Sequence, residues 1–408
     1  MPRPTTRPCL TLPATALAIT MAVCLPAFAQ SAAPINDGSA NIPGLTPAFP
    51  EQTEAPAQIT RGTIRQQVIA RGLEHPWAVA PLPGGAGYLV TERPGALRHI
   101  GVDGTISAPI ANVPDVRAMR QGGLLDVAIA PDFAQSRVIY LTFAKPTGLG
   151  MSATAAIRAT LSADMTRLED VTEIFEQSPA ALAPLHYGSR IVPLADGRLA
   201  ITTGDRGMSA DLAQDPSTGY GAVVMIRSDG QPAPGNPAET RPGFLPEVFS
   251  HGHRNIQGAA IQPETGQLWT VEHGPAGGDE VNIIAHAGNY GWPLASYGEN
   301  YNGRPIADGR SAHAPDFIPP RYYWDPVIAP GGMVFYEGAM FPDWNGDLLI
   351  AGLIAQAVVR LDIDGDTIRG EERLADGVGR VRDVAVDADG SILFVTDFDD
   401  GELIRLTR

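Results

Sequence analysis

The densest group of polar and glycine residues in the chain lies between positions 247 and 303. Within it, residues 274–278 have the sequence GPAGG and are followed by two acids, Asp279 and Glu280. A glycine-rich turn exposes backbone carbonyls, and carbonyl and carboxylate oxygens together are ligands that Ca²⁺ prefers. The segment is therefore a candidate calcium site, although the same pattern also suits a glycine-rich turn whose acids are solvated.

Candidate residues for proton transfer and anion binding lie elsewhere in the chain. His186, within LHYGSR, is a residue type that can act as a general base near neutral pH. Arg380 and Arg382, within GRVRDV, alternate and would point to one face of a strand, where an arginine pair binds anions. Taken singly, each also suits a packing histidine or a surface arginine pair. Taken together with a cation, they suit a small anionic cofactor and a polyol substrate.

One strand–turn–strand sequence pattern recurs along the chain, and the fold that it predicts must position these residues. Each copy is a short or alternating apolar run, a turn that usually contains glycine or proline, and a second apolar run. Further apolar runs follow several copies, which gives about four short strands per unit. Repeated antiparallel units of this kind predict an all-β fold, a six-bladed β-propeller of four-stranded antiparallel blades, rather than a two-sheet sandwich. The copies begin at Trp77, Leu124, Arg190, Gly258, Gly332 and Val381.

The candidate residues share one place in this pattern. Gln121 precedes the first strand of the second unit, His186 that of the third and Arg380 that of the sixth. Since equivalent strands of a propeller begin at the same face, we expect these side chains to gather at one end of the central channel. The last unit ends close to Arg408, and the run that begins at Thr63 is well placed to add a strand to it and close the ring.

The first 29 residues have the pattern of a secretory signal peptide. They combine a basic start, an apolar stretch and a small-x-small motif that ends at Ala29, so we expect cleavage after this residue and export to the periplasm. Both cysteines, Cys9 and Cys24, would be removed, which leaves a mature chain without disulfides or cysteine metal ligands. Residues 30–58, rich in Ala and Pro, are expected to form a flexible leader before one propeller domain at residues 59–408.

The charge of the chain argues against several classes of partner. Its 45 acidic residues against 29 lysines and arginines give a net charge of −16. Such a surface argues against nucleic acid and anionic membranes as partners, and we expect no membrane span in the mature chain. The glycines at positions 84–87 lie in a strand–strand turn, without the helix that a nicotinamide-dinucleotide fingerprint requires.

An ordered set of short motifs resembles a known family. QGGLLDVAIAPDF, HYGSR, GHRNIQG, EHGPAGGDEVNI, NYGWP and RVRDV follow one another between His75 and the C-terminus. This order is similar to that of the soluble PQQ-dependent aldose sugar dehydrogenases of the glucose/sorbosone type. The resemblance implies a six-bladed propeller that holds PQQ and Ca²⁺ at the mouth of its channel, in agreement with the repeat count.

The resemblance also implies roles for individual residues. His186 matches the family's catalytic histidine, which takes the proton from the anomeric hydroxyl of the sugar as hydride passes to the C5 carbonyl of PQQ. The positions that match PQQ contacts are Gln121, Arg254, Asn255, Tyr301, Arg380 and Arg382. The positions that match calcium ligands are Gly274, Pro275, Glu280 and Tyr290.

Three positions depart from the family pattern. Leu185 stands where Asp or Asn usually precedes the histidine, Ile354 stands near the place of a lysine that contacts PQQ, and Ile256 replaces a common proline. The loss of two polar contacts would weaken PQQ binding by about 1–3 kcal/mol each if both groups were buried.

The predicted function is a periplasmic quinoprotein, a monomer or homodimer, that oxidises the C1 hydroxyl of aldose sugars to lactones and passes the electrons to an external acceptor. Two alternatives remain at this point. One is a Ca²⁺-dependent hydrolase such as a lactonase, with Asp279 or Glu280 around the metal and His186 as base. The other is a Ca²⁺-binding propeller that holds a glycan or protein without catalysis.

Overall fold

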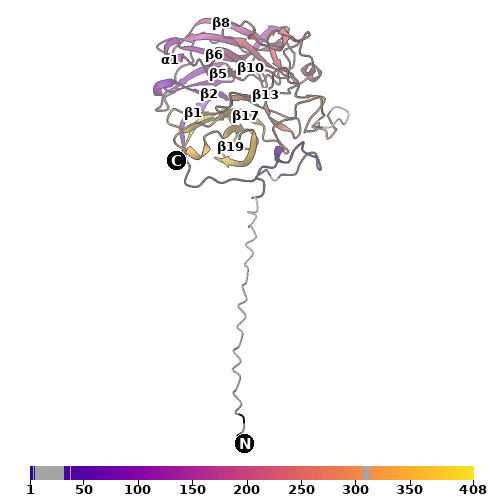
Figure 1. Cartoon of the computed structure of the whole chain (residues 1–408). Helices are drawn as coiled ribbons and strands as arrows, with labels where there is room; N and C mark the ends of the chain where they lie inside the picture. Colours follow the sequence, from indigo (N-terminus) through magenta and orange to yellow (C-terminus); the bar gives the residue numbers. More distant parts are fainter. Residues whose placement is uncertain (3, 5–31, 37, 307–311, 313) are drawn as a thin grey trace. The chain divides into compact units, whose positions relative to one another are not determined.

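The computed structural model describes residues 1, 2, 4, 32–36, 38–306, 312 and 314–408 (Figure 1). Residues 33–408 form one compact unit, which is described here by itself. Ala29 and nearly all of the predicted signal peptide lie outside the described residues. None of the helices in the described part of the chain is long and apolar enough to cross a membrane.

Six antiparallel sheets confirm the predicted six-bladed propeller. Blade 1 contains β2 (Pro76–Pro81), β3 (Tyr88–Glu92) and β4 (Ala96–Ile100), and blade 2 contains β5 (Leu124–Ile129), β6 (Val138–Gly148), β7 (Met151–Leu161) and β8 (Leu168–Glu176). Blade 3 contains β9 (Ile191–Pro193), β10 (Arg198–Thr202), β11 (Val223–Arg227) and β12 (Val248–Ser250), and blade 4 contains β13 (Ile256–Ile261), β14 (Leu268–Glu272), β15 (Asp279–Ile283) and β16 (Tyr322–Trp324). Blade 5 contains β17 (Pro330–Phe335), β18 (Leu348–Gly352), β19 (Ala357–Asp364) and β20 (Thr367–Leu374). Blade 6 contains β21 (Val381–Val386), β22 (Ile392–Thr396), β23 (Gly401–Thr407) and β1 (Arg65–Leu73).

Blade 1 differs from the predicted four-stranded pattern because its sheet has three strands. An irregular segment takes the place of a fourth strand. Ser107 N donates to His99 O at 2.9 Å, and Ile110 N donates to Leu97 O at 2.9 Å. These bonds satisfy part of the free edge of β4, so the edge is not left open. A short helix, α1 (Phe133–Ser136), fills the turn between β5 and β6 in the next blade.

The ring is closed by both ends of the propeller. Strand β1 pairs antiparallel with β23, from Arg65 opposite Thr407 to Leu73 opposite Gly401. The prediction that the run from Thr63 would supply a strand to the last blade is confirmed. Because β1 is the outer strand of a sheet whose other three strands end the chain, blade 6 ties the two ends of the propeller together.

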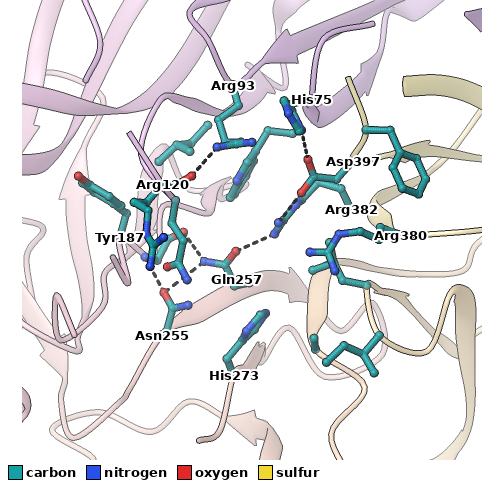
Figure 2. Close-up of a pocket in the computed structure, with 18 of the residues that line it drawn as sticks. His75, Arg93, Arg120, Tyr187, Asn255, Gln257, His273, Arg380, Arg382 and Asp397 are labelled. Carbon is teal, nitrogen blue, oxygen red and sulfur yellow. Dashed lines mark hydrogen bonds and ion pairs between the residues drawn. The ribbon is translucent and has the colours of Figure 1, made fainter. Parts of the chain in front are cut away.

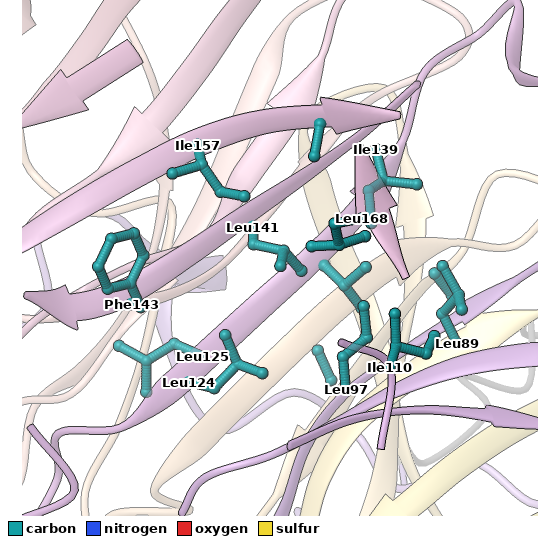
Figure 3. Packing of buried hydrophobic residues seen from close by; sticks show 14 of the residues in the cluster. Leu89, Leu97, Ile110, Leu124, Leu125, Ile139, Leu141, Phe143, Ile157 and Leu168 are labelled. Atoms are coloured by element: carbon teal, nitrogen blue, oxygen red, sulfur yellow. The ribbon is translucent and has the colours of Figure 1, made fainter. Parts of the chain in front are cut away.

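Large alternating side chains hold neighbouring blades together. Along β6, Ile139, Leu141 and Phe143 point to one face and are at most 2% exposed. They belong to one buried cluster with Leu89 of blade 1 and Leu124 of β5 (Figure 3). Burial of each such side chain contributes about 1.5–3 kcal/mol, so the core fixes the inner strands that carry the channel loops.

The segment before the propeller, for which a flexible leader is predicted, makes specific contacts with the propeller. We call residues 33–36 and 38–60 the N-terminal strap, because they contact blades 4 and 5. Asn41 and Ile42 donate three hydrogen bonds to the carboxylate of Asp325, at 2.7–3.0 Å. Gln52 is fully buried and donates to Tyr297 Oη at 3.0 Å and to Pro320 O at 2.7 Å. Extended chain without hydrophobic periodicity can dock in this way through hydrogen bonds, which composition alone does not reveal.

Candidate active site

A pocket of about 740 Å³ lies where the loops that precede the inner strands converge (Figure 2). Gln121 lies before β5, Asn255 directly before β13, and Arg380 directly before β21. The side chain of Arg382, two residues after Arg380, lines the same pocket. The structure therefore brings these four residues, from three blades, to one site. The other lining residues are His75, Trp77, Arg93, Arg120, Leu125, Tyr187, Gly188, Gln257, His273, Ala329, Leu353, Ile354, Asp397, Phe398, Asp399 and Asp400.

Four arginines line this pocket, although the chain as a whole is acidic. They are Arg93, Arg120, Arg380 and Arg382, and the lining also includes Asp397, Asp399 and Asp400. Arg382 is paired with Asp397 at 3.0 Å, yet its Nε has no hydrogen-bond partner among the described residues. Burial, and then the neighbouring Arg382, lowers the pKa of Arg380. An arrangement of guanidinium groups that repel one another and lack a full set of partners suits an anion with several carboxylates.

His186 and Asp205 form a hydrogen-bonded pair beside this pocket. His186 Nδ1 lies 2.6 Å from Asp205 Oδ1, and the backbone N of His186 donates to Gln121 Oε1 at 2.7 Å. The side chain of Asp205 is also fixed by Trp292, whose Nε1 donates to Oδ2 at 2.7 Å. Because a carboxylate only accepts, Nδ1 of the histidine must carry the proton, and Nε2 keeps a lone pair when the ring is neutral.

The surroundings of His186 favour its neutral form. Burial lowers the pKa of His186, the hydrogen bond to Asp205 opposes this effect, and the charge of Arg254 lowers the pKa further. A neutral imidazole with a free Nε2 is the form that accepts a proton. The sequence did not single out Asp205, although it lies within ITTGD, three residues after the second strand of the hairpin that begins at Ile191. That shared hairpin is the signal that would have found it.

The predicted calcium ligands lie together around a second, much smaller cavity of about 10 Å³. Gly274, Pro275, Glu280 and Tyr290 line it, and His273, which lines both cavities, places it next to the main pocket. Burial, and then the nearby charge of Glu272, raises the pKa of Glu280 well above its usual range. A cation in this cavity would remove that electrostatic cost, so the residues fit a cation.

Two acceptors near the small cavity are already engaged. Tyr290 Oη donates to Ile283 O at 2.6 Å and accepts from Ala285 N at 2.8 Å, so its backbone carbonyl is the oxygen left for a cation. Asp279 accepts from Gly274 N at 2.8 Å and from two backbone N–H groups that follow Pro326, so it organises the loop. No group of three or more His, Cys, Asp or Glu suited to a metal occurs in the part of the chain that the structure describes. A cation here would therefore depend on carbonyl oxygens as well as on Glu280.

Other predicted residues take different places. Tyr301 is 81% exposed on a surface turn and does not line either cavity. Arg254 lines the small cavity, where its guanidinium lies 5.3 Å from the ring of Trp292. Leu185 accepts a hydrogen bond from Arg206 Nε at 3.0 Å through its backbone carbonyl. Ile354 lines the main pocket and is 55% exposed, so no polar side chain lies at this point of the wall.

Comparison with known proteins gives consistent matches over the propeller. The profile of the Glucose / Sorbosone dehydrogenase family matches residues 73–405. The aldose sugar dehydrogenase YliI of Escherichia coli K12 is 39% identical over 346 residues, which cover 85% of this chain and 93% of that protein. A crystal structure of a glucose dehydrogenase is 43% identical, with a TM-score of 0.81, and covers 84% of this chain and 99% of the other. The PQQ-bound aldose sugar dehydrogenase of Streptomyces coelicolor is 27% identical, with a TM-score of 0.69, and covers 86% and 99% of the two chains.

Proposed function

The chain belongs to the glucose/sorbosone dehydrogenase family, and from this premise we propose that it is a PQQ-dependent enzyme that oxidises the C1 hydroxyl of aldose sugars to lactones. The observation that carries the proposal is the arginine-rich pocket next to a histidine that is held by an aspartate. Family membership makes the chain a sugar oxidoreductase. The cofactor, the base and the cation belong to the proposal.

The main pocket has the chemistry that PQQ requires. PQQ is a small planar quinone with three carboxylates, and when bound it supplies an acceptor for the hydride of the sugar. Arg380 and Arg382 would hold carboxylates of the cofactor, and Gln121 and Asn255 would contact its polar edge. Because the arginines lack a full set of acidic partners, an anion would satisfy charges that the protein leaves open.

His186 would act as the general base. Its Nε2 is the nitrogen free to take the proton of the C1 hydroxyl, and Asp205 keeps Nδ1 protonated so that the ring cannot switch its tautomer. Asp205 also stabilises the imidazolium that results, because its carboxylate lies 2.6 Å from Nδ1. Burial of the ring keeps water from competing for Nε2.

Glu280 and the carbonyls of Gly274 and Pro275 would hold Ca²⁺. A cation at this place would supply Lewis-acid polarisation to a neighbouring cofactor carbonyl. The chain's own contribution is a small cavity whose buried carboxylate, Glu280, makes no ion pair within 4.0 Å among the described residues. Export to the periplasm, an external electron acceptor and a monomeric or homodimeric state stay predictions of the sequence.

Reconstitution of the metal-stripped protein tests the proposal. Purified chain that begins after Ala29 would be mixed with PQQ and Ca²⁺, and aldose-dependent dye reduction and cofactor absorbance would be followed against an EDTA control. We expect activity only when both additions are present. No binding of PQQ at micromolar concentration would contradict the proposal and favour a hydrolytic or purely binding propeller.

A histidine substitution then tests the base. His186→Gln is expected to lower kcat by about 10²–10⁴-fold, because a positioned general base contributes that much, while PQQ binding is retained. The matched control is His286→Gln, since His286 is exposed and its Nε2 contacts only Gly235 O among the described residues. A His186→Gln enzyme with wild-type kcat would remove the base assignment.

A further inference from the structure

Gln257 lies at the centre of the pocket floor, between Asn255 and Arg382 (Figure 2). It is the second residue of β13 and is 8% exposed. We propose that Gln257 is a positioning residue that sets the distance between Arg382 and Asn255, and thereby matches the pocket to the length of its cofactor. This inference rests on the proposed function, because the cofactor that the two residues would contact is PQQ.

The amide of Gln257 makes contacts in both directions. Its Oε1 accepts from Arg382 Nη1 at 3.1 Å, and its Nε2 donates to Gly188 O at 3.1 Å and to Asn255 Oδ1 at 3.2 Å. A guanidinium only donates and a backbone carbonyl only accepts, so the amide has a single orientation that satisfies both. One side chain therefore connects blade 6, through Arg382, with Asn255 and with the loop that carries His186.

The backbone of Gln257 is itself anchored to the channel axis. Its carbonyl accepts from Arg190 Nε at 3.2 Å. The guanidinium of Arg190 lies between Asp126, at 2.7 Å, and Asp383, at 3.1 Å. All three charged side chains are at most 9% exposed, and they come from blades 2, 3 and 6. This buried group therefore anchors the backbone of Gln257, from which the amide reaches Arg382 and Asn255.

Arg382 has a second partner, Asp397, and this explains why the hydrogen bond with Gln257 is needed to position its guanidinium. Asp397 Oδ2 lies 3.0 Å from Arg382 Nη2, and Asp397 is in turn bound by His75 at 2.7 Å. Without the oxygen of Gln257, the guanidinium of Arg382 would be held by Asp397 alone and would turn toward the wall. Asn255 would at the same time lose one of the two donors to its Oδ1, the other being Gly188 N at 3.1 Å. Both ends of the pocket floor would then be free to move.

Titration of the apo protein with PQQ, followed by cofactor absorbance and protein fluorescence, tests this inference. Gln257→Met keeps the length of the side chain and removes all three hydrogen bonds, and we expect PQQ affinity to fall at least about tenfold. Gln257→Glu keeps the acceptor for Arg382, loses the two donations and adds a negative charge under an anionic cofactor. We expect its affinity to fall at least as far.

The matched control is Gln262→Met. Gln262 follows the same strand, is 2% exposed and donates to Gly365 O at 2.7 Å, far from the pocket residues. We expect this variant to bind PQQ with wild-type affinity, and thermal unfolding of all variants would show that each is folded. Wild-type affinity in Gln257→Met, or an equal loss in Gln262→Met, would overturn the inference alone. A wild-type protein that does not bind PQQ would overturn the proposed function and this inference with it.

Discussion

At the scale of single residues, the candidate site works through pairs and not through isolated groups. The proposed base, His186, depends on Asp205 to fix its tautomer, and Asp205 is fixed by Trp292. The proposed cation ligand, Glu280, is buried with Glu272 nearby, and a cation would offset the charge of the two carboxylates. In each case the partner comes from another part of the sequence, so the proposed chemical role depends on how the folded chain places the two residues.

The pH dependence of catalysis follows from the surroundings of His186. Burial lowers the pKa of its imidazole, so the proton leaves at a lower pH and the neutral base persists below the usual value of about 6.5. We therefore expect the acid limb of the kcat/KM profile to have a midpoint below this value. A midpoint at or above it would contradict this account of the site. The measurement is aldose-dependent dye reduction by the reconstituted enzyme across pH.

The side chain of Arg380 is expected to lower the thermal stability of the apo protein and to increase the affinity for PQQ. Its pKa is lowered by burial and by Arg382, which means that its charged form is disfavoured in the folded apo state. Arg380→Ala should therefore leave the thermal midpoint of the apo protein unchanged or raise it, and weaken PQQ binding by about tenfold or more. Calorimetric unfolding and PQQ titration on one preparation check both signs. A fall in apo stability without loss of PQQ affinity would mean a structural role.

Sequence motifs identified several residues of the pocket but not the residues that hold them in position. Gln121 and Arg382 could be named because each lies at the start of a repeated unit, where all blades open to the same face, and Asn255 was named from the family resemblance. Asp205 and Gln257 were not singled out, because their importance depends on contacts that cross between strands and blades. Tyr301 was named from the resemblance alone, and it lies on an exposed turn away from both cavities. A short sequence motif does not determine where a residue lies in the folded chain.

At the scale of elements, the N-terminal strap extends the propeller beyond the matched family region, which begins at residue 73. Its contacts reach the loop that carries the predicted calcium ligands. The Asp325 carboxylate that binds Asn41 lies against Gly277, where an added Cβ would approach its Oδ1 to 2.6 Å. The strap therefore supports the Gly274–Gly278 loop from outside. The composition of the strap, rich in Ala and Pro, gave no sign of these contacts. The alternating hydrophobic pattern of the blade strands, in contrast, was recognisable in the sequence.

Removal of the strap is expected to destabilise the propeller. A chain that begins at Arg61 would lose the three hydrogen bonds to Asp325 and the buried side chain of Gln52. With about 1 kcal/mol for each hydrogen bond, the free energy of unfolding should fall by at least about 3 kcal/mol. The matched control begins at Ala33 and keeps the strap. Equal midpoints of the two chains in urea would show that the strap contributes nothing.

At the scale of the whole molecule, stability depends on closing a ring. Strand β23 pairs with both β22 and β1, so it is the element that joins the last blade to the start of the propeller. Its loss would leave two strand edges open and would expose the buried side chains of Phe394 and Val395, which pack in the same clusters as Ile404 and Leu403 of β23. The sequence predicted this closure, because the last copy of the repeat ends close to Arg408 and leaves its blade one strand short.

Truncation at the C-terminus tests ring closure. A chain that ends at Asp400 lacks β23, and we expect it to lose cooperative thermal unfolding and to bind a hydrophobic dye. The control lacks only Arg408, whose backbone carbonyl accepts a hydrogen bond from Arg65 at 3.0 Å, and should unfold like the complete chain. Cooperative unfolding of the shorter chain at the wild-type temperature would contradict the role of β23.

The place of β1 in blade 6 also affects the order in which the propeller can be completed during synthesis. Strand β1 precedes blades 1 to 5 in the chain, but its partner β23 follows all of them. The pocket residues Arg380 and Arg382 belong to the same late blade. A chain that stops before blade 6 therefore keeps an unpaired edge at β1 and lacks these two arginines. Closure of the ring is thus a late step of synthesis.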